Sequence, residues 1–328
     1  MECRRRALTR RAFIRQGASV GGLLGLGSTV VPALTQPERP RVGIARSPRV
    51  LADGAVDAEV VGAMIDRAVM WAVGIDSADR AWSSLFSSDE VVGIKPNGLA
   101  DITCSTAPEV VAHCVQRLHG VGVRPESIII WDETPGHLAA CGVPPDEAPW
   151  GARAYLTHDH IGDTVENGRF RDGLFLPLQR EIDAILNLPI LKCHPICGVT
   201  MAMKNHYGSI GHPADQHFDN CHTPIADLSA IADIRDKTRL VVCDGTRALI
   251  EGQALGPPQY FPNIVMAATD VVAHDAVGAR IIEEERERRG IPPLNEVGLE
   301  PRYIAMAEER GLGVASLEAI DYQVIDLP

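Results

Sequence analysis

The chain is predicted to fold as an α/β protein, with a mostly parallel sheet, helices on both of its faces and a small antiparallel insertion. Short β-branched and aliphatic runs alternate with amphipathic helical patterns, an order typical of β-α-β units with right-handed crossovers. Several predicted strands are continuous apolar runs, as expected when helices cover both faces of a sheet. The segment 157–178 is the predicted antiparallel insertion, because it has short alternating patches and turn residues.

The first predicted element is a twin-arginine export signal over residues 1–33. Arg10 and Arg11 stand in the run T-R-R-A-F, ahead of a Gly-rich, mildly apolar stretch at 17–31. The small residues that end at Ala33 predict that the signal is cleaved after this residue. The apolar stretch is too short and too Gly-rich for a stable membrane span, and a retained N-terminal anchor is the competing interpretation. The signal predicts the twin-arginine translocase as a partner and a periplasmic or extracellular location.

Residues 34–328 are predicted to form a single domain, because they contain neither a low-complexity linker nor an internal repeat. The predicted strands are 41–45, 91–95, 127–131, 184–188, 239–243 and 263–267. The predicted helices are 58–73, 108–120, 199–207, 223–231, 271–288 and 301–310. A long loop is predicted at 208–220, and loops of that length are usually functional or mobile.

The charge of the mature chain excludes some partners. Removal of residues 1–33 takes away six Arg and one Glu, so the formal charge changes from −12 to −17. A protein this acidic is not expected to bind nucleic acid through its overall field. No later segment is apolar enough to span a bilayer, so no membrane span is expected after removal of the signal.

Polar residues follow five of the predicted strands. Because the carboxyl ends of parallel strands meet at one edge of a sheet, where ligands bind, we expect these side chains to share a site. The residues are Lys95, Asn97, Asp132, Lys192, His194, Asp244 and Asp270. In the predicted catalytic set, Lys95, Lys192 and Lys204 hold a small anionic ligand. Asp132, Asp244 or Asp270 acts as a base or as a supporting carboxylate.

A helix is predicted to begin beside this edge. Thr106-Ala107-Pro108-Glu109 is a capping box with proline in the first turn. The free N–H groups of such an end favour an anion, although a helix start without a ligand is the alternative. The predicted substrate-binding residues are Asn97, Ser105, Thr106 and Asn205.

The segment 192–222 contains eight of the nineteen Cys and His residues of the chain. These side chains bind borderline and soft metals, so a Zn, Fe or Cu ion is the expected cofactor. The predicted ligands are Cys193, His194, His206, His217 and Cys221. Seven cysteines remain after cleavage, and an oxidising compartment favours disulfides. The alternative to a metal is therefore a disulfide between two of Cys193, Cys197 and Cys221.

Several common motifs are missing from the sequence. It contains no Walker A run, no G-x-G-x-x-G after the first strand, no G-x-S-x-G and no ferredoxin-type C-x2-C-x2-C. Neither a nucleotide cofactor nor a ferredoxin-type cluster is expected.

Seven segments together resemble the DUF362 family of prokaryotic proteins, in particular its exported twin-arginine branch. They are V-G-I-K-P-N at 92–97, S-T-A-P-E-V-V at 105–111, N-L-P at 187–189 with K-C-H at 192–194, G-V-T-M-A-M-K-N at 198–205, A-D-L at 226–228, V-C-D-G at 242–245 and D-V-V-A-H-D at 270–275. The resemblance covers most of the mature chain and supports the fold and the choice of site residues. It implies no particular activity. Family members often carry an added iron–sulfur domain, of which this sequence shows no motif, and 250–254 departs from the usual Gly-Gly-Pro-like turn.

Two functions remain open at this point. The first is an exported enzyme, metal-dependent or redox-active, that acts on an anionic substrate. The second is a non-catalytic periplasmic ligand- or metal-binding protein. Both need a polar cleft, so the sequence does not separate them. A structural, disulfide-stabilised domain is a third and weaker interpretation.

Overall fold

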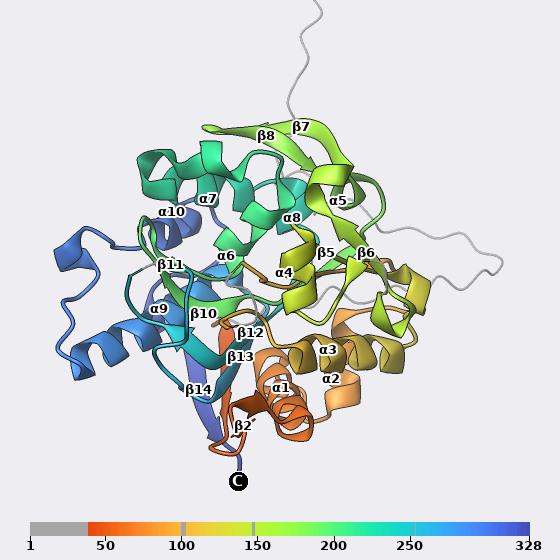
Figure 1. Cartoon of the computed structure of the whole chain (residues 1–328), viewed down its shortest axis with the longest axis horizontal. Helices are drawn as coiled ribbons and strands as arrows, with labels where there is room; N and C mark the ends of the chain where they lie inside the picture. Colours follow the sequence, from red (N-terminus) through yellow and green to blue (C-terminus); the bar gives the residue numbers. More distant parts are fainter. Residues whose placement is uncertain (1–38, 100–102, 146–147, 253) are drawn as a thin grey trace, which may run out of the picture. The chain divides into compact units, whose positions relative to one another are not determined.

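A sheet of ten strands forms the centre of the protein (Figure 1). The computed structural model describes residues 39–99, 103–145, 148–252 and 254–328, so the predicted export signal lies outside the described residues. Eight strands follow one another across the sheet in the order β14-β1-β13-β12-β9-β4-β5-β6, and β10 pairs with β12 and β11. Their bounds are β1 Arg41–Arg46, β4 Val92–Lys95, β5 Ile128–Asp132, β6 Arg153–Leu156, β9 Ala184–Asn187, β10 Ile190–His194, β11 Gly198–Thr200, β12 Thr238–Leu249, β13 Ile264–Ala268 and β14 Asp321–Asp326.

The sheet is mostly parallel, as predicted. Strands β12, β9, β4, β5 and β6 pair in parallel, and so do β1 and β14. The exception along this path is β13, which is antiparallel to both β1 and β12. The carboxyl end of β13 therefore lies at the opposite edge of the sheet from the carboxyl ends of β4, β5 and β9.

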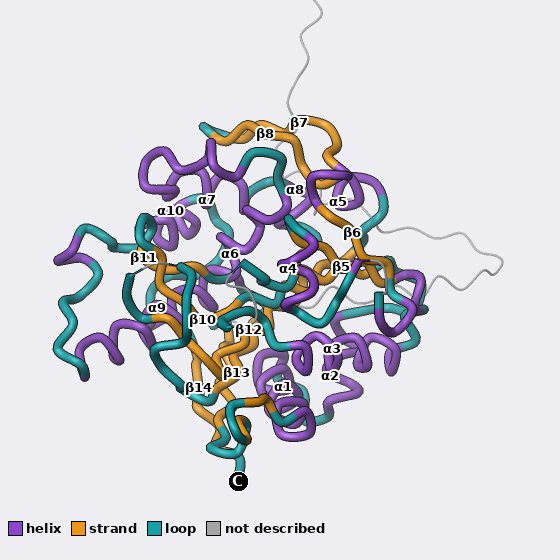
Figure 2. The backbone as a smooth tube through the Cα atoms, viewed as in Figure 1, coloured by secondary structure: helices purple, strands orange, loops and turns teal. Residues whose placement is uncertain are grey.

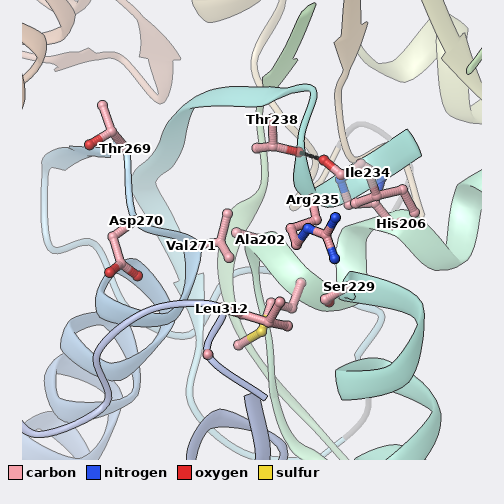
Figure 3. Close-up of a pocket in the computed structure, with 12 residues that line it drawn as sticks. Ala202, His206, Ser229, Ile234, Arg235, Thr238, Thr269, Asp270, Val271 and Leu312 are labelled. Atoms are coloured by element: carbon pink, nitrogen blue, oxygen red, sulfur yellow. Dashed lines mark hydrogen bonds between the residues drawn. The ribbon is translucent and has the colours of Figure 1, made fainter. Parts of the chain in front are cut away.

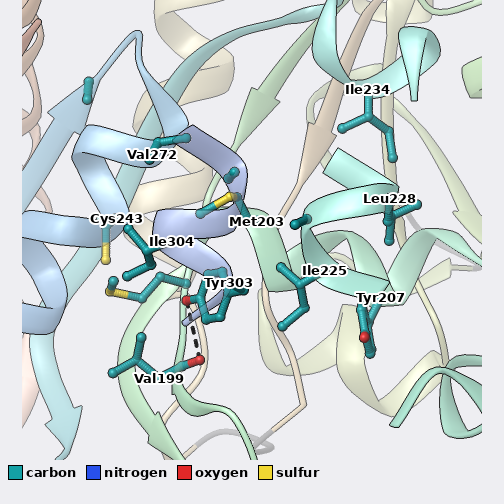
Figure 4. Close-up of a cluster of buried hydrophobic side chains, with 14 of the residues drawn as sticks. Val199, Met203, Tyr207, Ile225, Leu228, Ile234, Cys243, Val272, Tyr303 and Ile304 are labelled. Atoms are coloured by element: carbon teal, nitrogen blue, oxygen red, sulfur yellow. Dashed lines mark hydrogen bonds between the residues drawn. The ribbon is translucent and has the colours of Figure 1, made fainter. Parts of the chain in front are cut away.

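Helices cover both faces of the sheet (Figures 1 and 2). Alternate strand residues point to opposite faces, so Ile128 and Ile130 belong to one buried cluster while Ile129 and Trp131 belong to another. The first cluster includes α1 Ala58–Val73, α2 Ala78–Leu85 and α3 Pro108–Val121. The second includes α7 His222–Ser229, α9 Val271–Arg288 and α10 Tyr303–Glu309 (Figure 4). This two-sided covering explains the continuous apolar runs of the strands.

Local signals set the ends of α1 and its distance from the sheet. The Asp57 carboxylate accepts hydrogen bonds from two backbone N–H groups of the first turn, and Gly74 ends the helix with a φ of 73°. On the sheet side, a Cβ atom on Gly43 would lie 2.3 Å from the backbone oxygen of Ala68. The missing side chain at Gly43 therefore allows α1 to pack directly against β1.

The remaining elements confirm one prediction and correct another. The predicted insertion is an antiparallel hairpin of β7 Ile161–Asn167 and β8 Phe170–Phe175. The helix predicted at 199–207 is wrong in its first part, because Val199 and Thr200 pair with β10 in strand β11. The rest of that range is divided between a short helix, α6, and a 3-10 turn. The other described elements are β2 Leu51–Ala52, β3 Ala55–Val56, α4 Pro135–Ala140, α5 Leu176–Arg180, α6 Ala202–Asn205 and α8 Ala232–Arg235.

The predicted loop at 208–220 contains a 3-10 segment, Pro213–Cys221, with irregular backbone. Three successive residues, Asp219, Asn220 and Cys221, have φ values of 52°, 50° and 66°. Among the described helices, none is both long and apolar enough to cross a membrane.

Candidate functional site

The strand ends of β4 and β5 bring Lys95 and Asp132 together. Lys95 Nζ lies 3.0 Å from Asp132 Oδ1, and the two side chains are only 1% and 6% exposed. The strands are parallel neighbours, so their last residues meet at the same edge. The Gly208 backbone lies against this ion pair, since a Cβ atom there would be 2.8 Å from Lys95 Nζ and 2.9 Å from Asp132 Oδ1.

The Asp132 carboxylate is held in its charged form. Burial favours the neutral acid, but the Lys95 ammonium and His137 outweigh it and lower the pKa of Asp132 to about 2. The backbone N–H groups of Gly98 and Glu133 also donate to this carboxylate, at 3.0 and 2.8 Å. Near neutral pH, Asp132 is therefore a weak base that fixes the position of Lys95.

Three asparagines connect the strand ends behind this pair. Asn205 Nδ2 donates to the Asn187 side chain at 2.7 Å and to the Lys95 carbonyl at 2.9 Å. The Asn205 side-chain oxygen accepts from Asn97 Nδ2 at 2.9 Å. Asn187 also donates to the Ala202 carbonyl at 2.8 Å. The sequence prediction missed Asn187, although it is the last residue of β9 and begins the N-L-P motif.

Lys192 lies fully buried beside this network. Its Nζ donates to Asn97 Oδ1 at 2.9 Å, and it forms no ion pair with a carboxylate among the described residues. Burial lowers the pKa of the Lys192 ammonium to about 8. Four lysines occur in the whole chain, namely Lys95, Lys192, Lys204 and Lys237. Three of the four therefore lie at or next to this edge.

A cleft of about 270 Å³ opens at this edge of the sheet. Seven of the predicted residues line it: Lys95, Asn97, Asp132, His194, Lys204, Asn205 and His217. The other polar side chains that line it, which the sequence prediction missed, are Glu133, His137, Thr200 and Tyr207. Glu133 directly follows a strand-end aspartate, which was the available signal for that residue.

Lys204 contributes an unpaired positive charge to the cleft. The residue is only 7% exposed, and its Nζ lies 3.7 Å from the centre of the Tyr207 ring. In the described part of the chain no carboxylate forms an ion pair with it, and burial lowers the pKa of its ammonium. The aromatic face stabilises the cation in part.

His194 contributes a neutral N–H group. Its Nδ1 accepts hydrogen bonds from the backbone N–H groups of Ile196 and Cys197, at 3.2 and 3.4 Å. Burial and the Lys204 charge lower the pKa of His194 to about 3, so the ring is neutral. A neutral ring whose Nδ1 is an acceptor carries its proton on Nε2, which makes Nε2 a donor.

Several predicted site residues have protein partners instead of facing the cleft. Thr106 Oγ1 accepts from the Asn97 N–H at 2.9 Å and donates to the Leu188 carbonyl at 2.7 Å. The Asp244 carboxylate accepts from the N–H groups of Ala107 and Thr246, both at 2.9 Å. Ser105 is also buried and does not line the cleft, but its hydroxyl has no hydrogen-bond partner among the described residues. Thr106 and Asp244 therefore fix the loop before α3.

The prediction that Asp270 joins the strand-end site is wrong. Asp270 follows β13, whose antiparallel direction places it at the opposite edge of the sheet. Its Oδ1 accepts from the N–H groups of Val272 and Ala273, at 2.9 and 2.8 Å, and so caps α9. Asp270 lines a second cavity, of about 220 Å³, together with Arg235 and His206 (Figure 3).

The five predicted metal ligands do not converge. His206 lines the second cavity, and Cys193 belongs to a separate small cluster with Cys104. The described residues contain no group of three or more His, Cys, Asp or Glu side chains arranged to hold one metal ion. Within the predicted set, the rings of His194 and His217 stack with their centres 6.1 Å apart.

Comparisons with known proteins identify the family. Residues 92–280 match the model of DUF362, a domain of unknown function, which confirms the resemblance of the motifs. No curated protein matches the chain. A solved structure of a protein from Thermotoga maritima is similar, with 10% identity, a TM-score of 0.40 and coverage of 70% of this chain. This chain covers 59% of that protein, less than two thirds of its length. Since the matched residues are more than half of the sequence, the chain belongs to the DUF362 family.

Proposed function

We propose that this chain is an exported protein whose strand-end cleft binds a small anionic molecule through the ammonium of Lys204. The observation that carries the proposal is the charge of Lys204, which lines the cleft and has no carboxylate partner among the described residues. A buried ammonium without a counter-charge is unfavourable by several kcal/mol, on the order of the penalty for a buried ion. An anion in the cleft would supply the missing negative charge.

The groups around Lys204 suit a carboxylate or phosphate. The neutral His194 ring offers an Nε2–H donor, and a hydrogen bond between a charged acceptor and such a donor is stronger than a neutral one. Lys95 is already paired with Asp132 and adds little net charge. The cleft volume of about 270 Å³ suits a small molecule.

The state of Asp132 favours binding over general-base catalysis by this residue. A useful general base has a pKa near the working pH, whereas the Lys95 ammonium and His137 hold the pKa of Asp132 at about 2 despite its burial. We therefore place non-catalytic ligand binding first and an enzyme acting on the same anion second. Export by the twin-arginine route rests on Arg10 and Arg11 and is part of the proposal.

The test compares anion binding by three forms of the mature protein. Inorganic phosphate and succinate are titrated separately by calorimetry into the wild type, Lys204→Met and Lys237→Met. Lys237 is the matched control, because it directly precedes β12, pairs with Asp233 of α8 at 3.1 Å and does not line the cleft. We expect the wild type and Lys237→Met to bind at least one of the two anions, and Lys204→Met to bind neither.

The stability of the unliganded protein shows whether a loss of binding is caused by a loss of folding. Methionine has a similar length and needs no counter-charge, so unliganded Lys204→Met should be at least as stable as the wild type. Saturating anion should raise the unfolding free energy of the wild type, by about 2.7 kcal/mol at a concentration of roughly 100 Kd. Equal binding by a folded Lys204→Met variant would overturn the proposal, as would the absence of binding by the wild type.

A further inference from the structure

His137 lines the cleft, and the binding proposed for Lys204 makes no use of it. It is the third residue of α4, and its side chain is 15% exposed. Its backbone N–H donates to Thr134 Oγ1 at 3.2 Å, which caps the helix. The Gly98 backbone packs closely against it, since a Cβ atom on Gly98 would clash with the His137 carbonyl oxygen. Backbone contacts therefore fix the place of this residue at the cleft.

One nitrogen of the His137 ring faces a carboxylate without bonding to it. Nδ1 lies 3.8 Å from Asp132 Oδ1, which is too far for a hydrogen bond. This atom is buried and has no hydrogen-bond partner among the described residues, a rare and unfavourable arrangement. Nε2 is not such a buried atom, so it is the ring nitrogen that is open to the cleft. The ring thus lies between the Asp132 carboxylate and the space that an anion would occupy.

A bound anion would place a negative group beside each nitrogen of this ring. A neutral imidazole carries one N–H, so one of its two nitrogens presents a lone pair. If Nδ1 holds the proton, the bare Nε2 repels the anion. If Nε2 holds it, the bare Nδ1 faces the Asp132 carboxylate. An imidazolium donates from both nitrogens and removes this conflict.

Charges of both signs surround His137 before an anion binds. Asp132 and Glu133, at the end of β5, favour an imidazolium, while the ammonium groups of Lys95 and Lys204 oppose it. The other titratable groups of the cleft wall and of α4 are His194, Tyr207, His217 and Cys141, and His158 Nε2 lies 3.3 Å from Glu133 Oε1. The two carboxylates and the two ammonium groups offset one another. A bound anion adds a negative charge and shifts this balance towards the imidazolium.

We propose that His137 is a second binding group for the anion held by Lys204, and that its ring takes up a proton from solvent when the anion binds. This inference rests on the proposed function, because it needs an anion in the cleft. The ligand is a carboxylate or phosphate whose oxygens accept from the Lys204 ammonium and from the His137 Nε2–H. Histidine ordinarily gains its charge between about pH 8 and pH 5. Binding that depends on His137 therefore strengthens as the pH falls through this range.

The experiment is a calorimetric titration of the folded mature protein with succinate and, separately, with inorganic phosphate at about pH 7.5. Each titration is repeated in two buffers of different ionisation enthalpy, and the difference in heat gives the number of protons taken up per bound anion. The wild type is compared with His137→Gln, whose side chain keeps a neutral donor. Protons taken up by the anion or by Lys204 are common to both forms, so the difference between them belongs to His137.

His113→Gln is the matched control. His113 also lies beside an ion-paired aspartate, because its Nε2 is 3.1 Å from Asp66 Oδ1 and Asp66 pairs with Arg117. Its side chain is 17% exposed, close to the 15% of His137, but it does not line the cleft. This variant should take up as many protons and bind as tightly as the wild type.

We expect His137→Gln to take up fewer protons per bound anion than the wild type, by up to one proton. It should bind the same anion about tenfold more weakly, because one charge-assisted hydrogen bond is lost. The variant should fold normally, since the ring forms no hydrogen bond among the described residues. A second readout follows the imidazole NMR signals of the wild type, in which the His137 signal should move to its protonated position at saturating anion and constant pH.

Equal proton uptake by the wild type and by folded His137→Gln would overturn this inference, as would a His137 signal that the anion leaves in place. The proposed function would survive either result if Lys204→Met still abolished binding. Absence of anion binding by the wild type would overturn both, so the two failures are distinguishable.

Discussion

The Lys95–Asp132 ion pair gives the largest stability prediction for a single side chain. Asp132→Asn removes the negative charge but keeps the size of the side chain, so the buried Lys95 ammonium loses its partner. Breaking one side of a buried pair costs about 3–5 kcal/mol. The pKa of Asp132 gives a second estimate. Burial and the stronger effects of Lys95 and His137 together lower this pKa from 3.8 to about 2. At 1.36 kcal/mol per pKa unit, the shift corresponds to a stabilisation of the folded protein by about 2.5 kcal/mol. We therefore expect Asp132→Asn to lower the unfolding free energy by about 3 kcal/mol at pH 7.

The pH dependence of this loss follows from the direction of the pKa shift. The folded pKa of Asp132 lies below the unfolded value, so its charge stabilises the protein above the unfolded pKa. That contribution is lost as the pH falls from about 4 through about 2. The difference in unfolding free energy between the wild type and Asp132→Asn should therefore become smaller over this pH range. Asp66 and Asp219 also have lowered pKa values, but both forms share them.

The assay is urea unfolding followed by tryptophan fluorescence at several pH values. The control is Asp163→Asn, because Asp163 pairs with Arg180 at the surface, where the two side chains are 72% and 61% exposed. The unfolding free energy of Asp163→Asn should fall by far less than that of Asp132→Asn. The double variant Lys95→Met with Asp132→Asn should be more stable than the sum of the single changes predicts. A loss below about 1 kcal/mol in Asp132→Asn, independent of pH, would refute the assignment of a buried ion pair.

The remaining predictions concern packing, the corrected role of Asp270 and export. Gly43→Ala should destabilise the protein, because the added Cβ atom would clash with the α1 backbone. In Gly120→Ala, on α3, the added Cβ atom meets nothing within 4 Å, so this variant should be as stable as the wild type or more stable. Thermal unfolding of the two variants measures the difference. Asp270→Ala should lower stability by about 1–2 kcal/mol through the lost cap and leave phosphate and succinate binding unchanged, as calorimetry would show. Replacing Arg10 and Arg11 with Lys should retain the precursor in the cytoplasm, and unchanged periplasmic yield on cell fractionation would contradict the predicted signal.

The strand-end residues show what the sequence could and could not predict about the site. Lys95 and Asp132 were predictable, because parallel strands deliver their carboxyl ends to one edge. The place of Asp270 was not predictable, because the apolar run of β13 is compatible with either a parallel or an antiparallel strand. One signal was available in the connection 250–263. It contains no helical pattern, whereas parallel strands need a crossover that is usually a helix.

The Cys/His segment was singled out by composition alone, and composition does not give contacts. Strand alternation places Cys193 on the opposite face of β10 from Lys192 and His194. His206 turns towards Asn187 and Ser209, at 3.4 and 3.3 Å. These placements depend on how β11 and the short turns after it fold back. The sequence pattern at 199–207 was read as a helix, so that geometry could not be foreseen.

The central claim is that an anion in the cleft meets the ammonium of Lys204. Because the chain has four lysines, protein labelled with ¹³C at lysine Cε gives a spectrum with four side-chain signals, which single substitutions assign. The spectrum is recorded during titration with inorganic phosphate and, separately, with succinate. The proposal predicts that the Lys204 signal shifts saturably with one of these anions while the Lys237 signal stays in place. A Lys204 signal that is unaffected by both, or a shift that Lys237 shares equally, would contradict it.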